Sequence, residues 1–234
     1  MRVRSAPLFP PLARTGSEPI FRAPITKCVS EPSFAQAGAV YLTFDDGPDP
    51  EWTGRVLDVL AAARVRATFF VVGRAARAAP GLVRRIASEG HEIGNHSLSH
   101  RHPWRLREAA AREEVRGGAA AIAETLGRAP RWFRPPHGRM RRCMIDEAER
   151  SGQRTVLWSV SAIDWGPLGR ADEIAERLAR VEAGDIVLMH DGRNKHNKPG
   201  ELLHVLPSFL AQLKAKRSTP ALLSSIKPQL EALW

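Results

Sequence analysis

Short apolar stretches alternate with amphipathic stretches along most of this chain, and this alternation limits the possible folds strongly. Continuous apolar runs such as 39–43 and 67–72 are typical of strands buried on both faces, whereas 105–126 carries apolar residues at helical spacing. Repeated β-α units predict a parallel sheet or barrel with helices outside it. The predicted strands are 39–43, 67–72, 91–94, 132–134, 155–160 and 185–189, and the predicted helices are 50–60, 81–89, 105–126, 143–151, 171–182 and 201–215.

The length of the chain, 234 residues, falls within the range of a single α/β barrel domain. We expect this domain to cover 39–234 and to follow a basic N-terminal extension at 1–38 that is either packed on the barrel or flexible. Hydrophobic residues make up 43% and charged residues 26% of the chain, as in ordinary soluble proteins. No apolar run approaches the roughly 20 residues of a membrane span, so we expect no transmembrane segment.

The first residues and the two cysteines bear on the compartment of the protein. Arg2 and Arg4 are followed by prolines rather than by an apolar run of about 7 to 15 residues, so the sequence does not predict a signal peptide. We therefore expect a cytoplasmic protein, or a cell-envelope protein if the start codon is misassigned. Cys28 and Cys143 have no metal or redox spacing, and we expect two buried or idle thiols rather than a disulfide.

The net charge of +10 is concentrated at the two ends of the chain. Residues 1–38 carry a net charge of +3 and residues 193–234 carry +5, which leaves +2 for the stretch between them. Basic terminal segments are commonly solvated, and they can also attract polyanions such as cell-wall polymers, lipid headgroups or nucleic acid. The sequence has no zinc-finger spacing or helix-turn-helix pattern, so we expect no nucleic-acid partner.

Residues that bind metals or transfer protons follow the predicted strands. Adjacent Asp45 and Asp46 come after the first strand, and His96 and His100 come after the third. One carboxylate and two imidazoles form the ligand set of a catalytic zinc-type site, which leaves the second carboxylate free to act as a base. Chemistry in such folds lies at the carboxyl ends of the strands. Further groups at these ends are Arg134 to Gly138, Asp164 with Trp165, and His190 with Asp191.

At these positions the sequence resembles the polysaccharide deacetylase family, the carbohydrate esterases of the NodB-like and chitin deacetylase-like type. The family motif TFDDGP is complete at 43–48, and H-[ST]-x-x-H is complete at 96–100. The motif R-x-P-Y-G appears as Arg-Pro-Pro-His-Gly at 134–138, the Asp-Trp pair at 164–165, and L-x-H at 188–190. The resemblance extends over about 39–215. It implies an α/β fold, a distorted (β/α) barrel that often has fewer than eight regular units.

The resemblance assigns roles to the strand-end residues. It implies that Asp46, His96 and His100 hold a divalent metal, with Zn²⁺ expected first and Co²⁺ or Mn²⁺ as alternatives. It also implies that Asp45 is the general base. Arg134 beside Asp45 then keeps that carboxylate ionised and oriented, because a nearby opposite charge favours the charged form.

The resemblance also implies a proton donor and a substrate pocket. His190 is the expected general acid that protonates the leaving amine, and Asp164 is the expected partner that keeps its imidazole protonated. A backbone N–H near His137 and the metal are expected to hold the oxyanion of the tetrahedral intermediate. Trp165 and Leu188 are expected to form the apolar slot for the acetyl methyl group.

Three stretches depart from the family pattern or extend it. His137 stands where many members have tyrosine; we expect catalysis to survive this change and place His137 and Pro136 among the substrate-binding residues. Residues 216–220 lead into an amphipathic stretch at 222–234 in place of the usual final apolar strand, so we expect unusual barrel closure. The loop 192–200, rich in Asn, Lys and His, is expected to be solvated, with substrate contact as the alternative.

The resemblance implies a hydrolase that removes N-acetyl groups from amino sugars of a chitin-oligomer or peptidoglycan type and releases acetate. The expected partner is thus an acetylated amino-sugar oligo- or polysaccharide, and we expect a monomer. Alternatives are an O-acetyl esterase on xylan-type substrates and an amidase or deformylase on a lipid-linked sugar. A different class, an inactive sugar-binding module, is disfavoured because the base, the ligands, Arg134 and His190 are all retained.

Overall fold

Strand β1 (Ala39–Asp45) lies at the centre of the sheet in this computed structural model, which describes residues 38–226. All of its residues are buried. It pairs in parallel with β2 (Thr68–Val71) and with β7 (Ile186–His190), as expected for a strand read as a continuous apolar run. The predicted extension up to residue 37, Cys28 and the stretch beyond residue 226 lie outside the described residues. Cys143 is a buried free thiol, as predicted.

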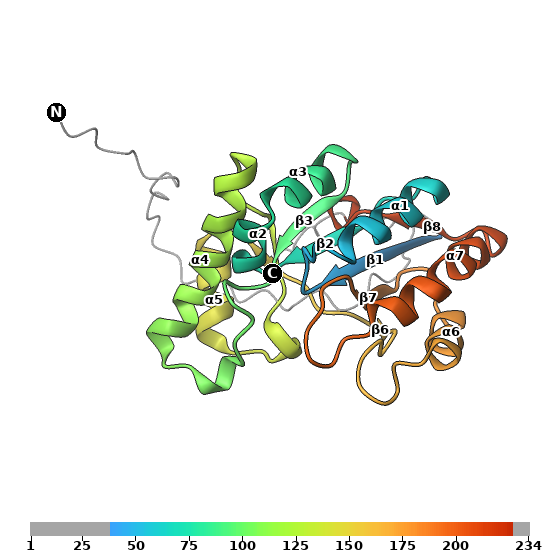
Figure 1. Cartoon of the computed structure of the whole chain (residues 1–234). Helices are drawn as coiled ribbons and strands as arrows, with labels where there is room; N and C mark the ends of the chain where they lie inside the picture. The colour runs from blue at the N-terminus through green and yellow to red at the C-terminus, as the bar shows by residue number, and fades with distance from the viewer. Residues whose placement is uncertain (1–37, 227–234) are drawn as a thin grey trace, which may run out of the picture.

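The described residues form one eight-stranded sheet, and every strand pair in it is parallel. The strand order is β5-β4-β3-β2-β1-β7-β6, with β8 paired to β1. The sheet curls into a distorted β/α barrel, which confirms the predicted fold class (Figure 1). The remaining strands are β3 (Glu92–Asn95), β4 (Trp132–Phe133), β5 (Arg154–Thr155), β6 (Val160–Ser161) and β8 (Thr219–Ala221).

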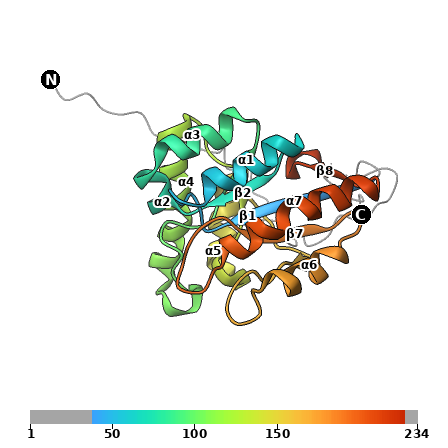
Figure 2. The same ribbon diagram turned by 45° about the vertical axis from the view of Figure 1, so that its right-hand side comes forward.

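Seven α-helices of the described residues cover the outside of the sheet (Figures 1 and 2). α2 and α5 pack on α4 at one side of the molecule, and α6 packs on α7 at the other. No helix in this part of the chain has the length and apolar character needed to cross a bilayer. The helices are α1 (Thr53–Ala63), α2 (Gly73–Ala78), α3 (Pro80–Ser88), α4 (Glu108–Leu126), α5 (Arg142–Arg150), α6 (Ala171–Ala179) and α7 (Pro199–Ala215).

The alternation of side chains along β1 separates the core from the site. Val40, Leu42 and Phe44 belong to the core between the sheet and the helices. Since successive side chains of a strand point to opposite faces, Thr43 and Asp45 face the barrel interior. Strand β7 follows the same rule, because Val187 and Met189 join the helix-side core while Leu188 and His190 face the inside. The barrel interior thus receives polar groups from strands that are otherwise apolar.

The predicted strand at 155–160 is wrong as a single element. β5 pairs with β4 at one edge of the sheet, and β6 pairs with β7 at the other edge. The residues between β5 and β6 cross from one edge to the other, so they cannot form a continuous ladder with either neighbour. The carbonyl groups of Val156 and Leu157 are therefore available to other donors.

The end of the chain and the start of α1 also differ from the expectation. β8 follows α7 and pairs with the first residues of β1, so a final strand is present despite the unusual sequence. Pro220 within β8 weakens the strand signal, because proline cannot donate to a ladder. Helix α1 begins at Thr53 rather than at 50, because Asp49 Oδ1 accepts hydrogen bonds from the N–H groups of Glu51 and Trp52 and closes a turn before it.

Candidate active site

A cavity of about 320 Å³ opens at the carboxyl ends of the strands. Eight of the residues that the sequence predicted for the site line this cavity: Asp45, Asp46, His96, His100, His137, Trp165, Leu188 and His190. Arg134 and Asp164 are fully buried behind this wall and contact it through Asp45 and His190. Pro136 is buried and is not one of the residues that line the cavity, and its predicted substrate contact stays a prediction.

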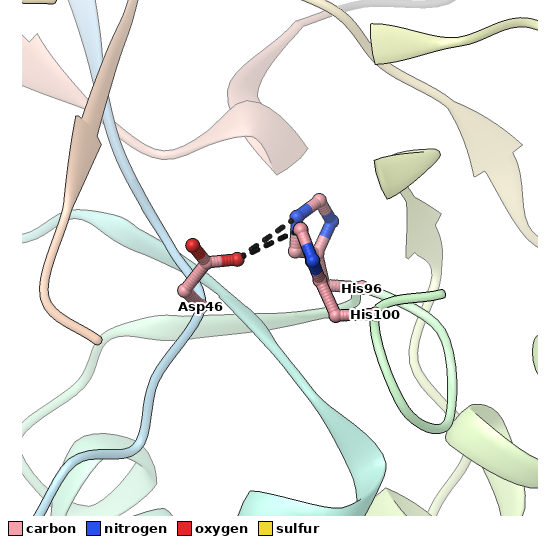
Figure 3. Close-up of side chains that lie close together, drawn as sticks. All are labelled: Asp46, His96 and His100. Atoms are coloured by element: carbon pink, nitrogen blue, oxygen red, sulfur yellow. Dashed lines mark ion pairs between the residues drawn. The ribbon is translucent and has the colours of Figure 1, made fainter. Parts of the chain in front are cut away.

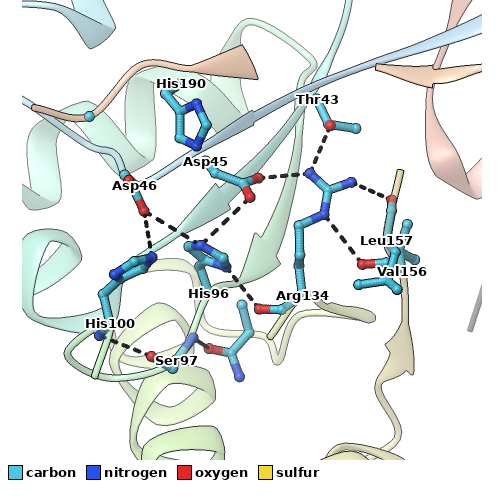
Figure 4. A network of polar contacts seen from close by, with 12 residues as sticks. Thr43, Asp45, Asp46, His96, Ser97, His100, Arg134, Val156, Leu157 and His190 are labelled. Atoms are coloured by element: carbon cyan, nitrogen blue, oxygen red, sulfur yellow. Dashed lines mark hydrogen bonds and ion pairs between the residues drawn. The ribbon is translucent and has the colours of Figure 1, made fainter. Parts of the chain in front are cut away.

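The turn after β1 points the two adjacent aspartates in different directions. Asp45 ends the strand, and Asp46 adopts a left-handed backbone conformation with φ of 75°. Such a conformation is uncommon outside glycine, asparagine and aspartate, and here it bends the chain at once. Asp45 binds Arg134 through Oδ1 and has its Oδ2 3.6 Å from His96 Nε2, whereas Asp46 Oδ1 faces both His96 and His100 (Figure 4).

The loop after β3 is held by side chains that accept its backbone N–H groups. Asn95 Oδ1 accepts from Ser97 N, and Ser97 Oγ accepts from His100 N. The buried carboxylate of Glu114 on α4 accepts from both the N–H and the hydroxyl of Ser99. These bonds fix a loop in which Ser97 and His100 have positive φ values of 68° and 54°. The loop therefore presents its two imidazoles on one side.

We expect Gly118→Ala to disturb this histidine loop. A Cβ at Gly118 in α4 would lie 2.2 Å from Asn95 Oδ1 and 2.6 Å from the backbone carbon of Ser97, so the loop would have to move. Overpacking of this kind typically costs about 1–3 kcal/mol, so thermal unfolding should shift to lower temperature and metal affinity should fall. Gly81→Ala in α3 is the matched control, because a Cβ there meets nothing within 4 Å. An unchanged Gly118→Ala variant would show that the loop does not depend on this close approach.

Asp46, His96 and His100 form a triangle of potential metal ligands (Figure 3). Asp46 Oδ1 lies 3.0 Å from His100 Nε2 and 3.5 Å from His96 Nε2. This oxygen is buried, and no described group donates a hydrogen bond to it. His96 Nδ1 lies 2.8 Å from the carbonyl oxygen of Arg134. Because a carbonyl only accepts, Nδ1 carries a proton, and in the neutral imidazole that a metal ligand requires the Nε2 lone pair then faces the triangle.

The electrostatics of the triangle fit a divalent cation. Burial lowers the pKa of His100 to about 4, with His96 adding to the effect, so its imidazole is neutral and able to act as a ligand. Burial raises the pKa of Asp46, but the neighbouring imidazoles outweigh it and keep the carboxylate ionised. Burial also lowers the pKa of His96, and Asp45 and Asp46 overcome it, which shows that positive charge is favoured there. One carboxylate with two imidazoles matches the donors that zinc-type ions prefer.

Asp45 is held by a guanidinium group inside the barrel. Its Oδ1 lies 2.8 Å from Arg134 Nη1, and both side chains are buried. Arg134 also donates to Thr43 Oγ1 and to the carbonyls at 156 and 157 (Figure 4). Its guanidinium carbon lies 4.0 Å from the ring centre of Phe70. Since its donors have acceptors, the buried cation is tolerated and holds Asp45 as an oriented carboxylate.

His190 faces the same cavity and is paired with Asp164. Asp164 Oδ1 lies 2.8 Å from His190 Nδ1, and its other oxygen accepts from the backbone N–H of His190 at 2.8 Å. Burial lowers the pKa of His190, but the charge and hydrogen bond of Asp164 outweigh it and raise this pKa to about 9. The Trp165 ring packs edge-on against the imidazole with centres 5.2 Å apart. This arrangement gives a protonated imidazole whose orientation is fixed.

Comparison with known proteins agrees with these motifs, because the family model described as polysaccharide deacetylase matches residues 35–156. The chain belongs to this family. It is 41% identical over 155 residues to the chitooligosaccharide deacetylase of Bradyrhizobium sp. (strain ANU 289), an alignment that covers 66% of this chain and 71% of the relative.

Two solved structures of the polysaccharide deacetylase fold extend the comparison. The peptidoglycan N-acetylglucosamine deacetylase Bc1960 superposes with a TM-score of 0.75 at 34% identity, covering 81% of this chain and 87% of that one. BA3943 of Bacillus anthracis, described as a pseudoenzyme of carbohydrate esterase family 4, superposes with a TM-score of 0.76 at 26% identity, covering 87% and 68%. The shared fold therefore includes both a deacetylase and a pseudoenzyme.

The polysaccharide deacetylase site also contains Asp191, which the sequence placed at a strand end without assigning it a role. Asp191 is buried beneath the turn after β1, where its Oδ2 accepts from the hydroxyl of Thr53 at 2.5 Å. Burial raises the pKa of Asp191 to about 7. A Cβ at Gly47 would lie 2.2 Å from Asp191 Oδ2, which explains why the turn has glycine here. The position of Asp191 directly after His190 was the available signal.

The cavity wall includes a loop that the sequence predicted to be solvated. Asn194, His196 and Asn197 line the cavity, and Asn194 and His196 are also exposed, so the loop is solvated and forms part of the cavity wall. The loop stays at the cavity because an isolated bridge joins Asn197 to Trp165 and because the asparagine side chains bond the site itself. Trp158, which also lines the cavity, lies in the segment between β5 and β6 that was read as continuous strand.

The side chain of His137, the departure from the usual tyrosine, lies between two other imidazoles. It has a positive φ of 57°, and its ring lies 4.6 Å from that of His100 and 5.2 Å from that of His102, centre to centre. Burial and His102 lower the pKa of His137, so the ring is neutral near pH 7. The predicted role of His137 in substrate binding stays a prediction, and its place in the cavity wall is compatible with it.

Proposed function

We propose that this protein is a metal-dependent deacetylase that removes N-acetyl groups from amino sugars in a chitin-type oligomer or in peptidoglycan, with release of acetate. One observation carries the proposal: a metal-ligand triangle, a carboxylate held by arginine and an imidazole held by aspartate all face one cavity. The named activities of the chitooligosaccharide and peptidoglycan deacetylase relatives support the substrate class.

The first half of the proposed reaction uses the metal triangle and Asp45. A divalent ion held by Asp46, His96 and His100 would act as a Lewis acid, polarising the acyl carbonyl and lowering the pKa of a water molecule. Asp45 accepts the proton of the attacking water in our proposal, because its contact with Arg134 orients the carboxylate. In our proposal a backbone N–H near His137 stabilises the oxyanion of the tetrahedral intermediate.

The second half of the proposed reaction needs a proton for the leaving nitrogen. His190 supplies it in our proposal, because Asp164 binds Nδ1 and leaves the other nitrogen toward the cavity. Trp165 and Leu188 line the same cavity and offer an apolar surface for the acetyl methyl group. Asp45 and His190 thus have distinct roles in the proposal, because Arg134 orients the first while Asp164 raises the pKa of the second to about 9.

The test is acetate release by the purified protein loaded with Zn²⁺, Co²⁺ or Mn²⁺. N-acetylglucosamine oligomers and peptidoglycan fragments are expected to yield acetate, acetylxylan much less, and a chelator is expected to abolish the reaction because the three ligands then hold no ion. Elemental analysis should find about one ion per chain, since three donors converge at one place.

Three results would contradict parts of this proposal. If no ion is bound and a chelator does not change the activity, the reaction does not depend on a metal. Faster release from acetylxylan than from the amino-sugar oligomers would favour an O-acetyl esterase. A protein that binds the oligomers and the metal but releases no acetate would be an inactive sugar-binding module; a pseudoenzyme, BA3943, is known on this fold.

A further inference from the structure

The second oxygen of Asp46 is held by two amide groups. Asn197 Nδ2 donates to Asp46 Oδ2 at 2.7 Å, and Asn194 Nδ2 donates to the same oxygen at 2.8 Å. Asp46 Oδ1, which faces both histidines, receives no such bond within the described chain. We infer that Asn194 and Asn197 are positioning residues that leave Asp46 one oxygen for the metal; this inference rests on the proposed function.

The other contacts of the two side chains determine which end of each amide faces Asp46. Asn197 Nδ2 also donates to the carbonyl of Gly192 at 3.0 Å, and two acceptors require the nitrogen at this end. Asn194 Oδ1 accepts from the N–H groups of His196 and Asn197, which places its nitrogen toward Asp46. Both amides are therefore donors to the carboxylate, and the same bonds fold the loop that carries them.

The loop is attached to the acid side of the site as well as to the metal side. The N–H of Gly166 donates to the carbonyl of His196 at 2.9 Å, and the N–H of Lys198 donates to the carbonyl of Asp164 at 2.8 Å. A Cβ at Gly192 would lie 2.2 Å from the backbone of Asp46, so the loop approaches that turn as closely as glycine allows. The two asparagines thus lie on a loop that connects the turn at Asp46 with the segment at Asp164.

Two donors on one oxygen have a defined effect on a metal ligand. A carboxylate with both oxygens free can rotate or bind a cation through both of them, whereas an oxygen that accepts two N–H bonds has its lone pairs occupied. The carboxylate of Asp46 is then fixed in orientation before the metal arrives. Outer partners of this kind typically contribute about 10- to 100-fold in metal affinity.

The test compares Asn197→Ala and Asn194→Ala with Lys195→Ala, an exposed residue of the same loop, as the matched control. Zn²⁺ affinity is measured by competition with a chromogenic chelator, and the absorption spectrum of the Co²⁺-loaded protein reports ligand geometry. Each asparagine variant should bind Zn²⁺ about 10- to 100-fold more weakly and change the Co²⁺ spectrum, and Lys195→Ala should do neither.

A further variant separates loss of the bond to Asp46 from misfolding of the loop. Asn194→Ser keeps an oxygen that can accept from the backbone N–H two residues on, but it is too short to keep the bond to Asp46, so it should also weaken Zn²⁺ binding. Wild-type affinity and spectra in the asparagine variants, with metal bound by the wild type, would overturn the inference and leave the proposed function standing. A wild-type protein that binds no metal would overturn both.

Discussion

Asp46→Ala is expected to lose metal and activity together, whereas Asp45→Asn is expected to keep the metal and lose about 10²- to 10⁴-fold in kcat. The reason is that Asp46 Oδ1 faces both histidines while Asp45 is paired with Arg134. Asparagine at 45 keeps an oxygen for Arg134 but can no longer take a proton from water. Metal content by elemental analysis and kcat from acetate release separate the two effects.

The control for this pair is Asp172→Asn, an exposed carboxylate on α6 that should change neither property. Thermal unfolding of Asp45→Asn shows whether the loss of charge beside Arg134 has disturbed the fold. If Asp45→Asn released the metal while Asp46→Ala retained it, the two roles would be reversed.

His190→Ala is expected to slow amide hydrolysis by about 10²- to 10⁴-fold with the metal retained, and to slow activated esters much less. An amine leaves only when it receives a proton, whereas an activated phenolate leaves without one. The measurement is kcat/KM on an N-acetylglucosamine oligomer and on an aryl acetate with the same preparation. Equal losses on the two substrates would mean that the proton comes from elsewhere, and His137 would be the first residue to test.

Asp164→Asn tests the role of His190 as proton donor by changing the pKa of its imidazole. In the wild type, burial lowers the pKa of His190 and Asp164 more than offsets this, raising it to about 9, so the imidazolium persists below that pH. Without the carboxylate the imidazolium is less stable and deprotonates at a lower pH. The alkaline limb of the pH–rate profile should therefore move to lower pH. An unmoved limb would show that His190 does not set it.

The sequence predicted the side chains at the strand ends better than it predicted the strands. Asp45, His96 and His190 each follow a predicted strand, and the carboxyl ends of parallel strands meet at one rim. The role of each group came from the resemblance to the deacetylase family. The geometry explains why the two aspartates have different orientations. Side-chain alternation along β1 points Asp45 into the barrel, and the left-handed backbone of Asp46 turns the chain away from the strand direction.

Contacts between distant segments could not be predicted in this way. Asn194 and Asn197 lie about 150 residues from Asp46, and nothing in a loop rich in asparagine, lysine and histidine distinguishes donors to a buried carboxylate from solvated side chains. The interruption between β5 and β6 was missed for a related reason. Residues 155–160 have strand-like composition. Their division between two strands at opposite edges of the sheet depends on how the sheet closes.

That interruption has a consequence for engineering. The carbonyls of Val156 and Leu157 receive Arg134 because no neighbouring strand uses them. A redesign that turned the segment between β5 and β6 into regular strand would engage these carbonyls in strand pairing. The buried guanidinium would then lack acceptors, at a cost of at least about 1–3 kcal/mol for each lost acceptor. Arg134 would then have to find new acceptors or leave the interior, and Asp45 would lose its orientation. A more regular barrel of this sequence would be a poorer enzyme.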